Sequence, residues 1–343
     1  MTTMSKPHQL LIVGVGSIGH RHLRSFLTTG RVEAAICDPN TELRQQLAEQ
    51  YRVRRTYADL EAALADHHDA AVIATPANLH IPMAIRLADS GVHLLIEKPL
   101  STSWEGIEAL RSKVVERGVV AAVAYVYRAH PALRAMKAAL ESGRFGRPVQ
   151  LVAVCGQNFP TYRPAYREIY YRDHATGGGA IQDILTHVLN AGEWLIGPVN
   201  RLLADAEHQV LGGVEVEDTV HVLTRHGRAM GSYSLNQHQA PNEITVTVIC
   251  ERGTLRFENH KCRWRWMARP DEPWHDEPAA TIERDTMFIA QANGFLDAIE
   301  GGAPLFCTLE DGIQTLRANL AALTSVRSGT WQTIGIETRG AAR

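Results

Sequence analysis

The stretch LLIVGVGSIGHRHL, residues 10–23, places three glycines between an apolar run and a helical pattern. Gly14, Gly16 and Gly19 have the spacing G-x-G-x-x-G. Glycine weakens both strands and helices, so these positions need a backbone path that a side chain would block. Where a strand turns into a helix, such glycines permit a tight turn and close approach of a pyrophosphate. The stretch therefore predicts a dinucleotide-phosphate site, with Ser17 and Ile18 in the same turn.

A carboxylate stands where such a site needs one. Asp38 ends the next apolar run, 19 residues after Gly19, and is expected to bind the adenosine ribose. Asp38 could also cap the helix that follows, and both roles could coexist. No arginine directly follows Asp38, so a 2′-phosphate would meet a negative charge. This favours NAD as the cofactor over NADP.

The first part of the chain alternates short apolar runs with helical patterns. Continuous apolar runs predict strands buried on both faces, and apolar spacing at 3.6 residues predicts amphipathic helices. Repetition of strand and helix predicts an α/β fold, a Rossmann domain with a doubly wound parallel sheet over residues 1–128. The expected strands are 9–16, 32–38, 69–75, 93–99 and 119–127, and the expected helices are 41–51, 80–91 and 103–118.

After Pro148 strands follow one another with few helices between them, which predicts a largely antiparallel sheet in a second domain, residues 129–343. Two helices are expected around 285–300 and 308–328, and the sequence leaves open that the last one packs on the first domain. The expected strands are 148–157, 201–210, 219–227, 229–238, 242–250, 253–259 and 261–269.

Composition excludes several classes of protein. The 343 residues are 45% hydrophobic and 21% charged, with a formal net charge of −2, which predicts no nucleic-acid or membrane partner. The N-terminus has neither the regions of a signal peptide nor a membrane-spanning length. The five cysteines form no C-x-x-C pair and no metal-ligand spacing, so we expect free thiols, no metal and a cytoplasmic location. They are Cys37, Cys155, Cys250, Cys262 and Cys307.

Two further groups of residues carry chemistry. Thr75, Pro76, Asn78 and His80 follow one predicted strand, and Glu97 and Lys98 end the next; carboxyl ends of parallel strands are where such sheets bind ligands. The alternatives are a solvated strand-end lysine and a helix-entry histidine.

Asp183 and His187 follow the glycines at 177–179 and lie four residues apart, on one face of a predicted helix. A carboxylate beside an imidazole suits a general base. An exposed pair of no consequence is the alternative, but three glycines at the helix start indicate close approach of another group.

The segment NFPTYRPAYREIYYRD, residues 158–173, precedes this helix and is rich in arginine and tyrosine. Its arginines could clamp a carboxylate or phosphate, and its tyrosines could stack on a sugar ring. A surface loop whose arginines pair with local acids is the alternative. The candidate substrate residues here are Arg163, Tyr166, Arg167 and Arg172.

In this order, the glycine fingerprint, E-K-P and G-G-G with D-x-x-x-H resemble the Gfo/Idh/MocA oxidoreductase family, over nearly the whole chain. The resemblance implies a C-terminal α/β domain, residues 129–343, built on an open, largely antiparallel sheet. That domain is expected to bind substrate and to form oligomers, a homodimer or homotetramer, that pack their open sheets together. It makes Lys98 a catalytic lysine, Asp183 a substrate-binding residue and His187 the acid/base. It also places Gly14, Gly16, Gly19, Asp38, Thr75, Pro76, Asn78, His80 and Glu97 at cofactor contacts.

The run AYVYRAHP departs from the G-F-x-x-R-like run of many members, with Tyr125 and Arg128 as candidate substrate residues. The resemblance implies NAD-dependent hydride transfer at a secondary alcohol of a sugar, sugar acid or polyol. Two alternatives stay open: a redox-neutral NAD-dependent glycoside hydrolase of the same superfamily, and a non-catalytic NAD-binding regulatory protein.

Overall fold

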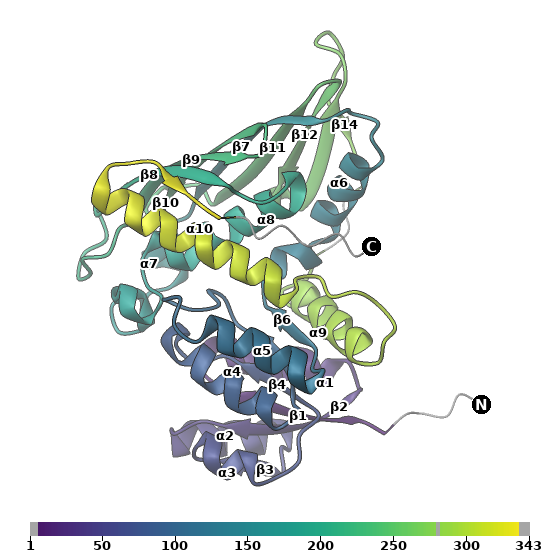
Figure 1. Ribbon diagram of the computed structural model, residues 1–343, viewed down its shortest axis with the longest axis vertical. Coiled ribbons are helices and arrows are strands. Elements are labelled where there is room, and N and C mark those ends of the chain that lie inside the picture. Colours follow the sequence, from purple (N-terminus) through teal and green to yellow (C-terminus); the bar gives the residue numbers. More distant parts are fainter. Residues whose placement is uncertain (1–5, 279–281, 336–343) are drawn as a thin grey trace. The chain divides into compact units, whose positions relative to one another are not determined.

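The computed structural model describes residues 6–278 and 282–335 and divides into two compact units (Figure 1). The first unit runs to Ala129 and also takes in residues 282–312. The second unit begins at His130 and resumes at Ile313. The sequence interpretation drew its boundary at residue 128 but assigned 282–312 to the second domain. The helix in this segment packs on a helix that covers the first sheet.

The first unit is built on a six-stranded, fully parallel sheet, as the sequence predicts. Its strand order is β3-β2-β1-β4-β5-β6, which is the doubly wound arrangement. Leu10, Leu11 and Ile12 have no exposed surface, because the central strand is covered on both faces. The strands are β1 His8–Val13, β2 Val32–Cys37, β3 Arg55–Tyr57, β4 Ala70–Ile73, β5 His93–Ile96 and β6 Ala121–Val123.

Helices cover this sheet, and one of them comes from late in the chain. The helices α4 and α5 pack on each other, as do α1 and α9 (Figure 1). The Phe26 and Phe295 rings meet edge to face, with centroids 6.3 Å apart, so α9 belongs to the core of this unit. The helices are α1 Ser17–Thr28, α2 Thr41–Tyr51, α3 Leu60–Leu64, α4 His80–Asp89, α5 Ile107–Arg117 and α9 Thr286–Ile299, with short turns η1 Ala77–Leu79 and η2 Val126–Ala129.

The second unit contains a nine-stranded sheet of order β14-β13-β12-β11-β7-β10-β9-β8-β15. Its pairs are antiparallel except β7 with β10, so the sheet is mixed and mostly antiparallel, as predicted. The strands are β7 Pro148–Gly156, β8 Arg201–Glu207, β9 Thr219–His226, β10 Ala229–Asn236, β11 Glu243–Cys250, β12 Gly253–Glu258, β13 Arg263–Met267, β14 His275–Asp276 and β15 Gln332–Thr333.

One face of the nine-stranded sheet is covered by helices: α8 contacts β7 and β10, and α6 contacts β12 and β13 (Figure 1). Alternate residues of β10 are buried under α8, as a half-covered sheet requires. The helical segments are α6 Pro131–Glu141, α7 Phe159–Tyr162, η3 Tyr170–Arg172, η4 His174–Thr176, the π-helix η5 Ile181–Leu185, α8 Thr186–Ile196, η6 Asn259–Lys261 and α10 Leu309–Ser328, which enters this unit at Ile313.

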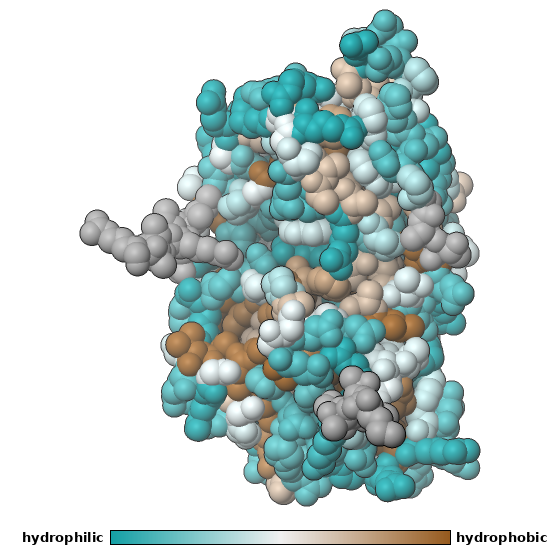
Figure 2. Space-filling model, turned by 90° about the vertical axis from the view of Figure 1, so that its right-hand side faces the viewer, coloured by the Kyte–Doolittle hydropathy of each residue, from teal (hydrophilic) through white to brown (hydrophobic). Residues whose placement is uncertain are grey.

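On the face shown in Figure 2, hydrophilic residues predominate, with apolar residues between them. The cysteines are all free thiols, as predicted. Across residues 6–278 and 282–335, no helix is long and apolar enough to cross a membrane. In the same residues, no three His, Cys, Asp or Glu side chains gather as metal ligands would.

Candidate active site

The glycine turn between β1 and α1 has the geometry of an anion site. Gly14 has φ +82°, and a Cβ there would lie 2.8 Å from the carbonyl oxygen of Ala74. A Cβ on Gly19 would lie 1.8 Å from the Gly14 carbonyl oxygen, so both positions exclude a side chain. Gly16 is exposed, has open space around its Cβ position and gives α1 no side-chain cap. The N-terminal N–H groups of α1 are thus suited to phosphate oxygens, and the turn fits a dinucleotide.

Asp38 lies beside this turn at the end of β2. Its Oδ2 accepts from the Val15 backbone N–H at 2.8 Å, and its Oδ1 accepts from the Asn40 N–H at 2.8 Å. The cap of α2 is Asn40, whose side chain accepts from the Leu43 N–H, so the capping role considered for Asp38 belongs to its neighbour. Arg44, six residues further along the chain, donates to the Asp38 carbonyl oxygen at 2.5 Å and so places a cation near Asp38.

The residues after β4 differ in exposure. Pro76 and Asn78 are exposed and Thr75 is half-buried. His80 has no exposed surface; its Nδ1 lies 3.1 Å from the Pro99 carbonyl oxygen and its Nε2 lies 2.8 Å from that of Thr75. Burial lowers the pKa of His80, although these carbonyls and Glu97 oppose the shift. The imidazole therefore ties the end of β4 to the segment after β5, instead of facing the solvent side.

Glu97 is also buried, and a histidine that the sequence did not suggest contacts it. The Nε2 of His22, on α1, donates to Glu97 Oε1 at 2.7 Å. The other carboxylate oxygen, Oε2, accepts from the Lys98 backbone N–H at 3.0 Å. Burial raises the pKa of Glu97, but the His22 hydrogen bond and the Lys98 charge outweigh it, and the pKa lies below its usual value. The half-buried Lys98 thus follows an ionised, internally paired carboxylate.

In the second unit, Asp183 belongs to the π-helix and His187 to the first turn of α8. The wider π turn changes the expected stacking of residues four apart on one α-helical face. Asp183 is 1% exposed, and its Oδ1 accepts from the Tyr170 hydroxyl at 2.8 Å. The Asp183–Tyr170 contact joins the helix to the tyrosine-rich segment, residues 158–173.

The glycines before this helix are required by packing within the unit. A Cβ on Gly178 would lie 2.1 Å from the Tyr171 carbonyl oxygen, and one on Gly179 would lie 2.6 Å from the Glu217 carboxylate. Glu217 accepts from the Ile181 N–H at 2.9 Å, and so it holds the start of the π-helix. The close approach predicted from three glycines therefore comes from this chain.

The arginine-rich segment divides into core and surface. Tyr166 is 1% exposed and donates to the Gly212 carbonyl oxygen at 2.7 Å. Arg167 donates to the same oxygen at 2.6 Å and stacks on the Tyr166 ring. Arg163 and Arg172 are exposed. Within this structure, Tyr166 packs in the core with Phe159 and Tyr171 and does not reach the surface.

Tyr125 and Arg128 also lie inside the first unit, at 1% and 5% exposure. The Arg128 guanidinium pairs with Asp311 at 3.0 Å and donates to the Phe306 carbonyl oxygen at 3.2 Å. These contacts join η2 to the first turn of α10 and to the segment before it.

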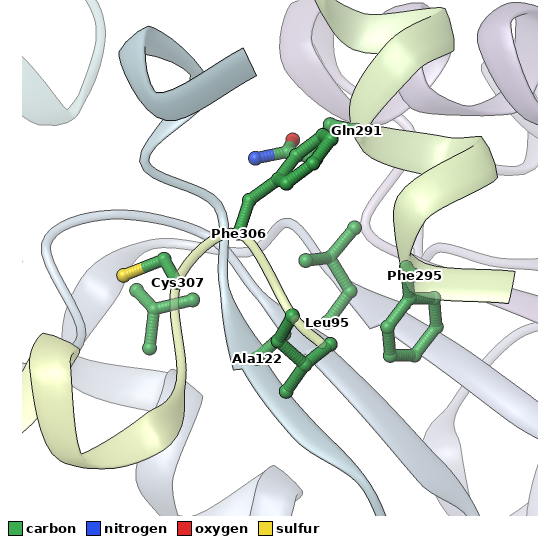
Figure 3. Close-up of a pocket in the computed structure, with 8 residues that line it drawn as sticks. Leu95, Ala122, Gln291, Phe295, Phe306 and Cys307 are labelled. Carbon is green, nitrogen blue, oxygen red and sulfur yellow. The ribbon is translucent and has the colours of Figure 1, made fainter. Parts of the chain in front are cut away.

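A small, largely apolar cavity lies near β5, β6 and α9 in the first unit (Figure 3). Gln291 and Phe295 from α9 line it together with Leu95 from β5. None of the predicted site residues lines this cavity, so it belongs to the packing of α9 rather than to the candidate site.

Comparison with known proteins agrees with the glycine turn and the two sheets. Residues 8–125 match the oxidoreductase family with an NAD-binding Rossmann fold, GFO_IDH_MocA, and residues 133–256 match the GFO/IDH/MocA C-terminal domain. The two matches together span most of the chain. The fold and site thus define an NAD-binding oxidoreductase, and the chain belongs to the Gfo/Idh/MocA family.

Relatives match this chain over nearly its whole length. It is 27% identical to levoglucosan dehydrogenase from Pseudarthrobacter phenanthrenivorans, over 93% of this chain and 96% of that protein. It is 25% identical to UDP-N-acetylglucosamine 3-dehydrogenase from Acidithiobacillus ferrooxidans, over 91% and 94%. Among solved structures, the WlbA dehydrogenase from Bordetella pertussis, in complex with NADH and UDP-GlcNAcA, is 26% identical with a TM-score of 0.85, over 97% and 99%.

Proposed function

We propose that this chain is an NAD-dependent dehydrogenase that oxidises a secondary alcohol of a sugar, sugar acid or polyol. The observation that carries the proposal is the uncapped glycine turn at α1, with Asp38 beside it and Lys98 at the carboxyl edge of the same sheet. The matched relatives named as sugar dehydrogenases support the reaction class.

Each polar residue then has a task. A bound nicotinamide would supply the hydride acceptor. His187 takes the hydroxyl proton of the substrate at an imidazole nitrogen, and Lys98 donates a hydrogen bond to the oxygen that gains charge. Asp183, held by Tyr170, binds a neighbouring hydroxyl and fixes the orientation of the sugar.

The substrate is best sought by a panel, because the matched relatives act on different sugars. Anhydrosugars, aldoses, polyols, sugar acids and nucleotide sugars should be offered with NAD, and NADH formation followed by absorbance. We expect NADH with at least one class. Glycoside cleavage without net NADH would replace this proposal with the redox-neutral hydrolase, and NAD binding without either reaction would favour the regulatory protein.

We also propose that the chain prefers NAD to NADP. Asp38→Ala should weaken NAD binding by about 1.5–3 kcal/mol, roughly 10- to 160-fold, because charge-assisted ribose hydrogen bonds are lost. Asp38→Asn is the matched control, since it keeps an acceptor oxygen for the Val15 N–H and removes only the charge. In fluorescence titrations with NADH and NADPH, both variants should show a smaller difference in affinity between the two cofactors than the unmutated protein does. Tighter binding of NADPH to the unmutated protein would contradict the preference.

We propose that the chain assembles as a homodimer or homotetramer through the uncovered face of the nine-stranded sheet. Leu223 and Met230, each 50% exposed, and Val154, 39% exposed, lie on adjacent strands of that face. Leu223→Glu should lower the mass measured by light scattering toward that of a monomer, because burying an unpaired carboxylate opposes association. Val115→Glu, at an 81% exposed position of α5, is the control and should leave the mass unchanged. A monomeric unmutated protein would refute this assembly.

A further inference from the structure

The backbone of Lys98 is the last member of a buried series of hydrogen bonds that runs from His22 on α1 through Glu97. His22, three residues after Gly19, is 1% exposed, and Glu97 is 5% exposed. The two oxygens of the Glu97 carboxylate serve different partners, His22 Nε2 at 2.7 Å and the Lys98 backbone N–H at 3.0 Å. One side chain therefore connects α1 to the backbone of Lys98.

The histidine is itself held by packing. The His22 ring meets the Phe288 ring edge to face with centroids 5.4 Å apart, and it lies 6.4 Å from the Phe26 ring. An ionised carboxylate only accepts hydrogen bonds, so the His22 Nε2 carries the proton that it shares with Glu97. A buried carboxylate that loses one such donor is costly to keep charged. His22 therefore stabilises the ionised Glu97 carboxylate, and that carboxylate accepts the hydrogen bond from the Lys98 N–H.

The other side of Lys98 has its own anchor. His80 contacts the carbonyl oxygen of Pro99, the residue after Lys98, from the interior of the unit. With Glu97 holding the N–H of Lys98 on one side and His80 holding the next carbonyl on the other, the backbone at Lys98 is fixed from both directions. A lysine side chain is flexible and does not orient its own ammonium group, so a fixed backbone narrows the positions that this group can take.

We propose that His22 is a positioning residue that acts through Glu97 to fix the backbone, and with it the ammonium group, of Lys98. The inference rests on the proposed function, in which Lys98 contacts the reacting oxygen. It links the two tasks of the first unit, because the helix whose N-terminus would bind cofactor phosphates also sets the direction of the lysine. Displacement of a positioned group by about 1 Å can cost 100-fold in rate.

The kinetic test compares three histidine variants. His22→Leu removes the donor, and we expect kcat to fall about 10-fold or more with KM for the sugar and Kd for NADH changed less than about 3-fold. His22→Gln returns an N–H donor and should recover most of kcat. His68→Leu is the matched control, since His68 is also buried in this unit but contacts the Ala63 carbonyl oxygen, and kcat should stay unchanged. Equal kcat in His22→Leu and the unmutated protein would overturn the proposal.

A second readout needs no activity. The chain has five lysines, so selective ¹⁵N-lysine labelling gives five backbone signals at most, and Lys98→Ala assigns the one of interest. Loss of the Glu97 acceptor should move the Lys98 amide signal in His22→Leu and leave it in place in His22→Gln, with the other lysine signals unmoved. An unmoved Lys98 signal in His22→Leu would overturn the proposal.

The same experiments separate this inference from the proposed function. If Lys98→Ala retains full turnover, the role of Lys98 fails, while the amide signal still reports whether His22 fixes its backbone. If Lys98→Ala is inactive and His22→Leu is fully active, only the positioning role fails. Should His22→Leu not fold, Glu97→Gln provides the test, because its single acceptor oxygen cannot serve both His22 and the Lys98 N–H. We then expect a partial loss of kcat and a shifted Lys98 amide signal. If kcat and the Lys98 signal both stay unchanged in Glu97→Gln, the positioning role is refuted.

Discussion

Lys98→Ala should lower turnover about 100-fold or more while NADH affinity changes little. The ammonium group is proposed to act on charge that develops in the transition state, and a donor lost there lowers kcat rather than ground-state binding. Steady-state kinetics on the best substrate of the panel and an NADH titration measure the two effects. The control is Lys113→Ala, because Lys113 pairs with Asp89 and Glu116 on the surface of the same unit.

His187 provides the partner experiment in the second unit. His187→Ala should also cut kcat by about 100-fold, since a positioned general base contributes 10²–10⁴-fold. His238→Ala, at a half-buried histidine of the same unit that hydrogen-bonds Thr219, serves as the control. Near-normal turnover in either Lys98→Ala or His187→Ala would remove that residue from the mechanism.

The fold could be read from the sequence because its main signals are local. Strands buried on both faces are continuous apolar runs, and β2, β4, β5 and β6 fall within the predicted ranges, while β1 begins one residue before its predicted range. In contrast, β3 has three residues, Arg55–Tyr57, with no apolar run, and it was missed. The position of α9 could not be predicted from its sequence. The spacing of its apolar residues indicates that one face is buried, but it does not indicate that the partner helix is α1.

The site shows the same division. The spacing of Gly14, Gly16 and Gly19 depends directly on backbone geometry, so the conformation of the turn between β1 and α1 could be predicted. The pairing of His22 with Glu97 joins residues 75 apart and has no local signature. The sequence of the tyrosine-rich segment does not indicate which ring is buried in the core. Tyr166 and Tyr170 have similar sequence neighbours, but Tyr166 donates to the Gly212 carbonyl oxygen and Tyr170 donates to Asp183.

The loss of folding stability at acid pH should depend strongly on His130, the first residue of the second unit. His130 is 1% exposed, its Nδ1 accepts from the Ala132 N–H as the cap of α6, and its ring meets Phe257 edge to face at 4.7 Å. Burial lowers the pKa of His130 to about 4. The folded state therefore favours the neutral imidazole.

The sign of the pH effect follows from linkage. Because the folded pKa lies below the unfolded value of about 6.5, the contribution to stability is complete above pH 6.5 and is lost as the pH falls toward 4. At about 1.4 kcal/mol per unit, the loss is roughly 3 kcal/mol. Urea unfolding midpoints measured from pH 8 to pH 4 should fall accordingly in the unmutated protein.

His130→Asn separates this effect from other titrations. Asparagine keeps an oxygen acceptor for the cap of α6 but does not titrate, so the variant loses the Phe257 ring contact at every pH and gains relative stability in acid. The difference in unfolding free energy between variant and unmutated protein should therefore shrink, or change sign, between pH 6.5 and 4. Since Glu97 and Asp218 also have lowered pKa values and remain in both proteins, their acid losses cancel in that difference. A difference that stays constant across this range would mean that His130 takes up its proton without unfolding, and that its surroundings admit the charge.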